Sequence, residues 1–123
     1  MEKHIVLKEK LEEAARLLVK SGYVTALVGA GLSVESGIPP FRGPGGLWTR
    51  YGEPPLNGFQ LFMENPKGWW ERQQRDDEEP SRQEMRRSLE DAKPNSGHYA
   101  LVDLEQMGVL RHIISQNIDN LHL

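Results

Sequence analysis

Apolar and polar positions follow two different periods along the first part of the chain. Apolar side chains recur at helical spacing from Leu7 to Leu18, and Gly22 follows as a helix stop, so a helix is predicted over residues 7–20. The next stretch, YVTALVG, runs apolar and β-branched without a charged interruption. Such a run is typical of a short buried strand, here over residues 23–28.

The second half of the chain contains a long charged segment and one further apolar run. The segment ERQQRDDEEPSRQEMRRSLED is interrupted by Pro80, which indicates two solvated helices joined by a turn. Asn95 or Ser96 can cap a later helix that Gly108 ends, and VLRHIIS is a second strand candidate. These patterns predict helices over residues 59–75, with a break near Pro66, over 81–92 and over 96–107, and a strand over 109–115.

This order of elements predicts an α/β fold. Two buried strands joined by helices favour a parallel pair with a right-handed crossover. Ligands of such sheets bind beyond the carboxyl ends of the strands, where polar clusters occur over residues 29–42 and 116–119. Residues 37–58 are rich in glycine and proline and have little to bury, so they are expected to form a mobile loop.

Composition excludes several classes of site. The 123 residues suffice for one small domain, and a net charge of -3 argues against a nucleic-acid surface built on bulk positive charge. The chain has no cysteine, and therefore neither a disulfide nor a thiolate metal site of its own. No apolar run approaches the ~20 residues that span a bilayer, and the charged N-terminus lacks a signal-peptide core, so a cytoplasmic location is expected.

The glycine-rich stretch GAGLSVESGIPPFRGPGG follows the first predicted strand directly. Backbone N–H groups in such a turn can approach a phosphate closely. Gly29 and Gly31 begin a G-x-G-x-x-G pattern, but Val34 stands at its third position. No Walker Gly-Lys-Ser/Thr follows, and no second strand ends in an acid as in a dinucleotide dehydrogenase. Phosphate binding and a purely structural turn both remain open on these residues alone.

Two further groups of residues have the right chemistry for a nucleotide. Arg42 can pair with a phosphate through its planar fork of donors, and Phe41 can shield a reactive ring from water. Gln116, Asn117 and Asp119 suit ribose hydroxyls and a carboxamide. The alternatives are a surface arginine beside a core phenylalanine, and an Asx-rich turn.

The segments GAGLSVESGIPPFRG and QNIDNLH together resemble the two signatures of the sirtuins, which are NAD-dependent protein deacylases. The intervening GGLW and PNSGHYALVDLEQMG also resemble sirtuin sequence, so the similarity covers nearly all of residues 20–123. It implies NAD as cofactor, an acyl-lysine protein as substrate, and a partial Rossmann-like large domain with a short parallel sheet and surrounding helices. His98 and His122 match family positions too and are interpreted either as structural or as supporting residues that contact the site residues and not the ligand.

The resemblance also implies a role for each matched residue. Asn117 is the catalytic candidate within this chain. The implied cofactor-binding set comprises the phosphate turn Gly29, Ala30 and Gly31 with Ser33, the loop residues Phe41 (nicotinamide) and Arg42 (phosphates), the nicotinamide pocket Ile38, Ile118 and Asp119, and the ribose-facing Gln116 and Asn117.

The chain departs from the sirtuin pattern in what it lacks. The general-base histidine, the four-cysteine zinc module and the adenosine half of the cofactor fold are not in this sequence. Residues 1–123 are therefore expected to be the N-terminal part of a sirtuin-type NAD-binding domain, inactive alone, and marginally stable or self-associating. Pro40 stands where many sirtuins have an acid or a threonine. Arg72 and Arg75 fall where sirtuins that prefer acidic acyl groups have Tyr-x-x-Arg, but the tyrosine is absent, which leaves the acyl preference open. The competing hypothesis is a non-catalytic module that binds NAD or ADP-ribose.

Overall fold

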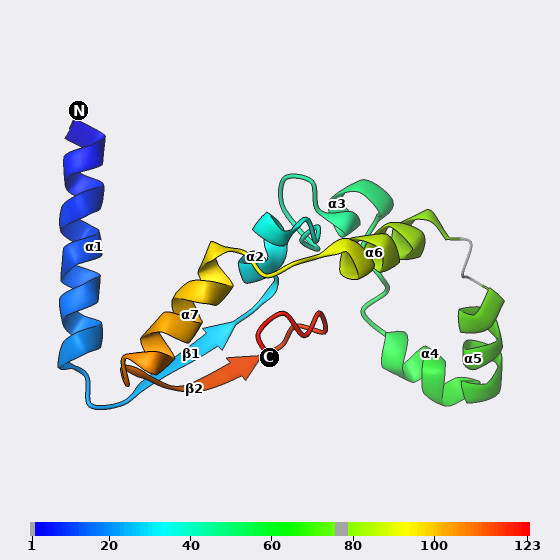
Figure 1. Ribbon diagram of the computed structural model, residues 1–123. Helices are drawn as coiled ribbons and strands as arrows, with labels where there is room; N and C mark the ends of the chain where they lie inside the picture. The colour runs from blue at the N-terminus through cyan, green and yellow to red at the C-terminus, as the bar shows by residue number, and fades with distance from the viewer. Residues whose placement is uncertain (1, 76–78) are drawn as a thin grey trace.

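The computed structural model describes residues 2–75 and 79–123, which form a small sheet with the helix Ser96–Gln106 beside it and further helices that extend away from it (Figure 1). Of the turn expected between the helices 59–75 and 81–92, residues 76–78 lie outside the described part. In chain order the elements are α1 (Glu2–Lys20), β1 (Val24–Val28), α2 (Ala30–Ser33), the 3-10 helix η1 (Val34–Ser36), α3 (Leu47–Tyr51), α4 (Gly58–Glu64), α5 (Pro66–Arg75), α6 (Pro80–Asp91), α7 (Ser96–Gln106) and β2 (Leu110–Ser115).

The two predicted strands pair in parallel, which confirms the α/β expectation. Their register joins Ala26 to Ile113 and Leu27 to Ile114, and an irregularity falls after Val24. Helix α7 returns the chain to the start of β2 and lies along the sheet (Figure 1). The carboxyl ends of both strands therefore lie at the same edge of the sheet.

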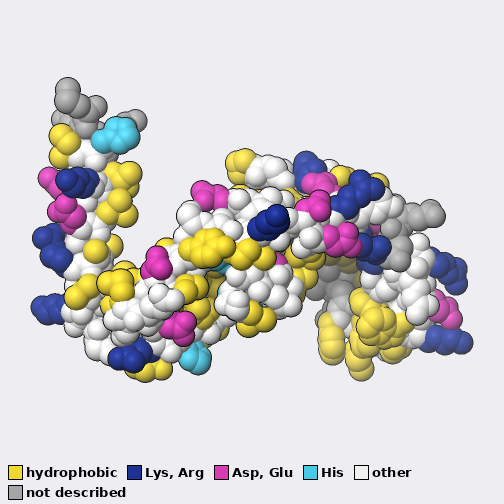
Figure 2. All heavy atoms as spheres, viewed as in Figure 1, with side chains coloured by type: hydrophobic (Ala, Val, Ile, Leu, Met, Phe, Trp, Pro, Cys, Tyr) yellow, Lys and Arg dark blue, Asp and Glu magenta, His cyan; other side chains and the backbone are white. Residues whose placement is uncertain are grey.

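The core is small and leaves apolar surface open. Among the described residues, the buried apolar side chains are Val28, Ile38, Leu47 and Leu110. The paired Leu27 and Ile114 are 72% and 52% exposed, so one face of the sheet is uncovered. Helix α1 stands away from the sheet with its apolar positions exposed (Figure 1), and yellow side chains are visible along it in Figure 2.

The segment 37–58 differs from the expectation of a loop with little to bury. It contributes Ile38 and Leu47, which are two of the buried apolar side chains, and it contains α3. A helix of five residues is too short to show a hydrophobic period, which explains why the pattern did not predict it. The expected break near Pro66 is confirmed, because α4 ends at Glu64 and α5 begins at Pro66.

Within the described ranges, no helix is long and apolar enough to cross a membrane.

Candidate functional site

The two polar clusters predicted from the sequence meet where the strands end. The backbone N–H of Gln116 donates to the carbonyl of Val28 (3.3 Å), which extends the ladder by one bond. The side-chain amide of Asn117 then donates to the carbonyl of Gly29 (2.9 Å). The turn after β2 is thereby fixed against the turn after β1.

A buried serine connects both turns to an acidic side chain. Ser33 ends α2 and is 1% exposed. Its hydroxyl donates to Asp119 Oδ2 (2.6 Å) and accepts from Asn117 Nδ2 (3.3 Å). The other carboxylate oxygen of Asp119 accepts from the N–H of Leu121 (3.0 Å). We call Ser33, Asn117 and Asp119 the polar network. Both carboxylate oxygens of Asp119 thus accept hydrogen bonds from the protein, which fixes the orientation of this side chain.

The glycine turn combines close packing on one side with open space on the other. A Cβ atom at Gly29 would lie 3.0 Å from Gln116 Nε2, so the bare backbone allows the Gln116 side chain to pack against the turn. A Cβ atom at Gly31 would meet nothing within 4 Å. The backbone there leaves room for a ligand to approach, as a phosphate-binding turn requires.

The remaining predicted site residues lie in different surroundings. Ile38 is buried at 7% exposure, whereas Ile118 is 77% exposed. The ring of Phe41 lies 4.9 Å from that of Trp48, and the Arg42 guanidinium lies 4.7 Å from a Trp48 ring centre. Arg42 Nε also donates to Glu53 Oε1 (2.9 Å). The structure thus groups Phe41 and Arg42 with Trp48 and Glu53, and the polar network forms separately from them.

The ion pair between Arg42 and Glu53 shifts the pKa of both side chains. The hydrogen bond from Arg42 lowers the pKa of Glu53 below its ordinary value, and the same bond raises the pKa of Arg42. Both side chains are exposed, so solvent screens this interaction.

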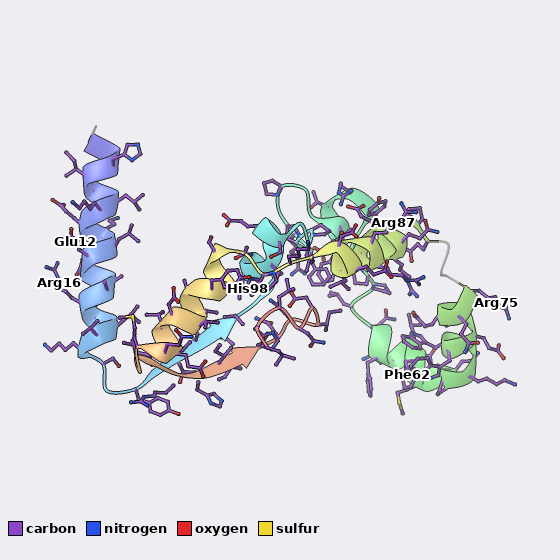
Figure 3. The ribbon with its side chains drawn as sticks, in the orientation of Figure 1. Glu12, Arg16, Phe62, Arg75, Arg87 and His98 are labelled. Carbon is purple, nitrogen blue, oxygen red and sulfur yellow. The ribbon has the colours of Figure 1, made fainter. Side chains whose placement is uncertain are left out.

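Asn95, which the sequence predicted only as a helix cap, also connects α7 to α2 and η1. Its side chain caps α7 by accepting from the N–H of Gly97 (2.8 Å). The same side chain donates to the carbonyl of Leu32 (2.7 Å) and to Ser36 Oγ (2.9 Å). His98, 4% exposed, completes the capping box by accepting from the Asn95 N–H (3.1 Å) (Figure 3). The structural interpretation of His98 therefore agrees with its contacts, and Asn95 holds α7 against the helix that carries Ser33.

A second link missed by the sequence joins α3 to α6. Arg50 Nη1 and the Tyr51 hydroxyl both donate to Glu84 Oε2, at 2.9 and 3.0 Å. No local pattern indicates this contact, because the partners are 33 and 34 positions apart. A cavity of about 660 Å³ opens beside it, and its lining combines the apolar and aromatic side chains Phe41, Leu47, Trp48, Tyr51, Met85 and Leu89 with the charged side chains Glu53, Glu79, Arg82 and Arg86.

Within residues 2–75 and 79–123, no group of three or more His, Cys, Asp or Glu side chains is arranged to hold a metal ion.

Comparison with known proteins gives a consistent result. Residues 29–123 match the protein family described as the Sir2 family. The chain is 48% identical over 111 residues to an NAD-dependent protein deacetylase of Sulfurisphaera tokodaii, covering 90% of this chain and 40% of the relative. It is 46% identical over 110 residues to an NAD-dependent protein deacylase of Pyrococcus abyssi, covering 89% and 40%.

Solved structures agree with the sequence relatives. A mutant Sir2 homologue in complex with ADP-ribose matches with a TM-score of 0.65 at 39% identity, covering 90% of this chain and 41% of that one. A Sir2 mutant with a p53 peptide and NAD matches with a TM-score of 0.58 at 33% identity, covering 90% and 39%. The chain thus spans about 40% of the length of the relatives it matches.

Proposed function

Because this chain belongs to the Sir2 family, we propose that it supplies the phosphate and nicotinamide side of an NAD-dependent protein-lysine deacylase. One observation carries the proposal: the hydrogen bond from Asn117 to the Gly29 carbonyl, which joins the two signature segments in one site. The residues present fit NAD, since an open glycine turn lies beside a fixed amide and a fixed carboxylate.

The polar network has a specific task in this proposal. Asn117 uses its NH₂ group within the protein, so its carbonyl Oδ1 is directed to accept from a hydroxyl of the nicotinamide ribose. Asp119 is oriented by Ser33 and by the Leu121 N–H, and its remaining lone pairs accept from the nicotinamide carboxamide. Ser33 acts as a positioning residue that fixes both partners.

The loop residues complete the cofactor side of the site. Arg42 pairs with the phosphates, Phe41 covers the nicotinamide, and Ile38 and Ile118 border it. Ala30 and Gly31 present the backbone of the turn to the phosphates, while Gln116 faces the ribose. When bound, NAD would supply the nicotinamide–ribose bond that breaks as the acyl-lysine oxygen attacks; with the addition of one water, the products would be nicotinamide, free lysine and O-acyl-ADP-ribose. The protein contributes positioning and the exclusion of water.

The proposal extends to the whole protein through its relatives. Residues 1–123 are the N-terminal part of a sirtuin-type NAD-binding domain, and the general base, zinc module and adenosine site belong to the remainder of such a protein. The chain alone binds NAD weakly and does not turn over, because a catalytic constellation acts as a unit. We propose a cytoplasmic enzyme that acts on acylated lysines of proteins.

The test is a titration of residues 1–123 with NAD and with ADP-ribose, followed through backbone amide shifts, alongside an assay of nicotinamide release with an acetyl-lysine peptide. Shifts confined to Gly29–Gly31 and Gln116–Asp119, without nicotinamide release, support the proposal. Asn117→Ala abolishes these shifts, while Asn65→Ala, which removes a side-chain bond in the α4–α5 turn, preserves them. Shifts that survive in Asn117→Ala, or turnover by the chain alone, contradict it.

A further inference from the structure

The carboxylate of Glu53 lies where an anion would bind Arg42. Arg42 Nε donates to Glu53 Oε1 (2.9 Å) and Nη2 donates to Oε2 (3.4 Å), so the two oxygens face two donors of the guanidinium. Arginine binds carboxylates and phosphates through this same two-point geometry. A phosphate that pairs with this edge of Arg42 has to displace Glu53.

The Trp48 ring holds the guanidinium in place for this pairing. The guanidinium carbon lies 4.7 Å from a Trp48 ring centre, within the range of a cation–π contact. Phe41 contacts the same indole. Trp48 therefore fixes both Phe41 and Arg42, while Glu53 accepts hydrogen bonds from two donors of the Arg42 guanidinium.

The backbone of the loop is closed around this arrangement. The N–H of Leu47 donates to the Pro40 carbonyl, and the N–H of Trp48 donates to the Phe41 carbonyl, both at 2.8 Å. Gly46 permits this closure, because a Cβ atom there would lie 2.7 Å from the Phe41 carbonyl oxygen. The pairing of Arg42 is thus built on a defined turn.

We propose that Glu53 is an internal competitor of the cofactor phosphates for Arg42, and that it weakens the binding of phosphate-containing ligands until they displace it. The inference rests on the proposed function, since it deepens the role assigned to Arg42. Exposed ion pairs are weak, so Glu53 raises the dissociation constant only about two- to fivefold.

The experiment measures binding of inorganic pyrophosphate and of ADP-ribose to residues 1–123 by calorimetry at low salt. Glu53→Gln removes the charge and keeps the shape, and is expected to tighten both dissociation constants about two- to fivefold. Glu79→Gln is the matched control, because it removes the same charge from another exposed arginine pair, with Arg82. Arg42→Ala tests the phosphate contact itself.

The outcomes separate this inference from the proposed function. Tighter binding by Glu53→Gln alone, lost when Arg42→Ala is added, supports the competition. The competition is overturned if the wild type, Glu53→Gln and Glu79→Gln bind with equal affinity. If Arg42→Ala still binds more weakly in that case, the role of Arg42 as a phosphate ligand stands. Equal tightening in both glutamine variants also overturns it, since net charge then explains the gain. Unchanged affinity in Arg42→Ala overturns both the competition and the assigned role of Arg42.

Discussion

The side-chain amide of Asn117 lies 2.9 Å from the carbonyl oxygen of Gly29, although the two residues are 88 positions apart. This bond closes the carboxyl edge of the sheet and aligns the polar network with the glycine turn. Its geometry depends on the parallel pairing of β1 and β2, so the integrity of the sheet and that of the site are linked.

The Ser33 hydroxyl should matter more to stability than a surface serine. Ser33→Ala removes the donor to Asp119 and an acceptor of Asn117 in a buried position, which is expected to cost about 1–3 kcal/mol in the free energy of unfolding. Urea denaturation measures the loss. Ser88→Ala, which removes a hydroxyl bonded to the Glu84 carbonyl within α6, is the control and should cost less than about 1 kcal/mol. Equal losses in the two variants would contradict the buried role of Ser33.

The loss of stability caused by a glycine-to-alanine substitution should depend on which atoms the added methyl group contacts. Gly46→Ala places Cβ 2.7 Å from a backbone oxygen, so the loop must shift, at a cost of about 1–3 kcal/mol. Gly29→Ala meets only the movable end of Gln116 and should cost less. Gly22→Ala meets nothing within 4 Å and serves as the control. Thermal unfolding gives the order, and amide shifts over residues 40–48 should change in Gly46→Ala alone; a different order would refute the close packing.

The cluster of Arg50, Tyr51 and Glu84 should make stability depend on pH at both ends of the scale. The hydrogen bond from Arg50 lowers the pKa of Glu84 below its ordinary 4.5, so the stability it contributes is present above that value and is lost as pH falls through the lowered pKa. The hydrogen bond with Glu84 raises the pKa of Tyr51 above its ordinary 10.0, so that contribution is present below this value and is lost as pH rises through the raised pKa.

The measurement is the melting temperature of the wild type and of Glu84→Gln from about pH 3 to about pH 11. The difference between the two proteins should be largest between the two titrations and should shrink toward both extremes. Glu90→Gln, on the same helix and exposed, is the control and should follow the wild type. A pH-independent difference would show that Glu84 acts through packing alone.

The open face of the sheet should cause self-association. Leu27 and Ile114 are register partners and both are exposed, so they form a contiguous apolar pair. Leu27→Lys is expected to reduce concentration-dependent sedimentation of residues 1–123. Leu56→Lys changes a side chain that is 100% exposed in a loop and should leave sedimentation unchanged. Wild-type protein that sediments as a monomer at every concentration would contradict the prediction.

Local patterns predicted the elements that depend on nearby residues. The apolar run at β1, the cap at Asn95 and the break at Pro66 are each determined within a few positions, and each is confirmed. The sequence also predicted that the two polar clusters meet, because parallel strands bring their carboxyl ends to the same edge of the sheet. The pairing of Arg42 with Glu53 and of Arg50 with Glu84 was not, since such contacts depend on the path of an irregular chain and leave no period in the sequence.

The bond between Asn95 Nδ2 and Ser36 Oγ has an evolutionary consequence. These residues are 59 positions apart in the chain, yet their side chains lie 2.9 Å from each other. The described residues between them, 37–75 and 79–94, lead away from the sheet and back to almost the same point, in the manner of an inserted module (Figure 1). Such an excursion can change in length and sequence without moving its anchor points. Selection can therefore remodel α4 and α5 while the strands, the glycine turn, the polar network and the Trp48 contacts of Phe41 and Arg42 stay as they are.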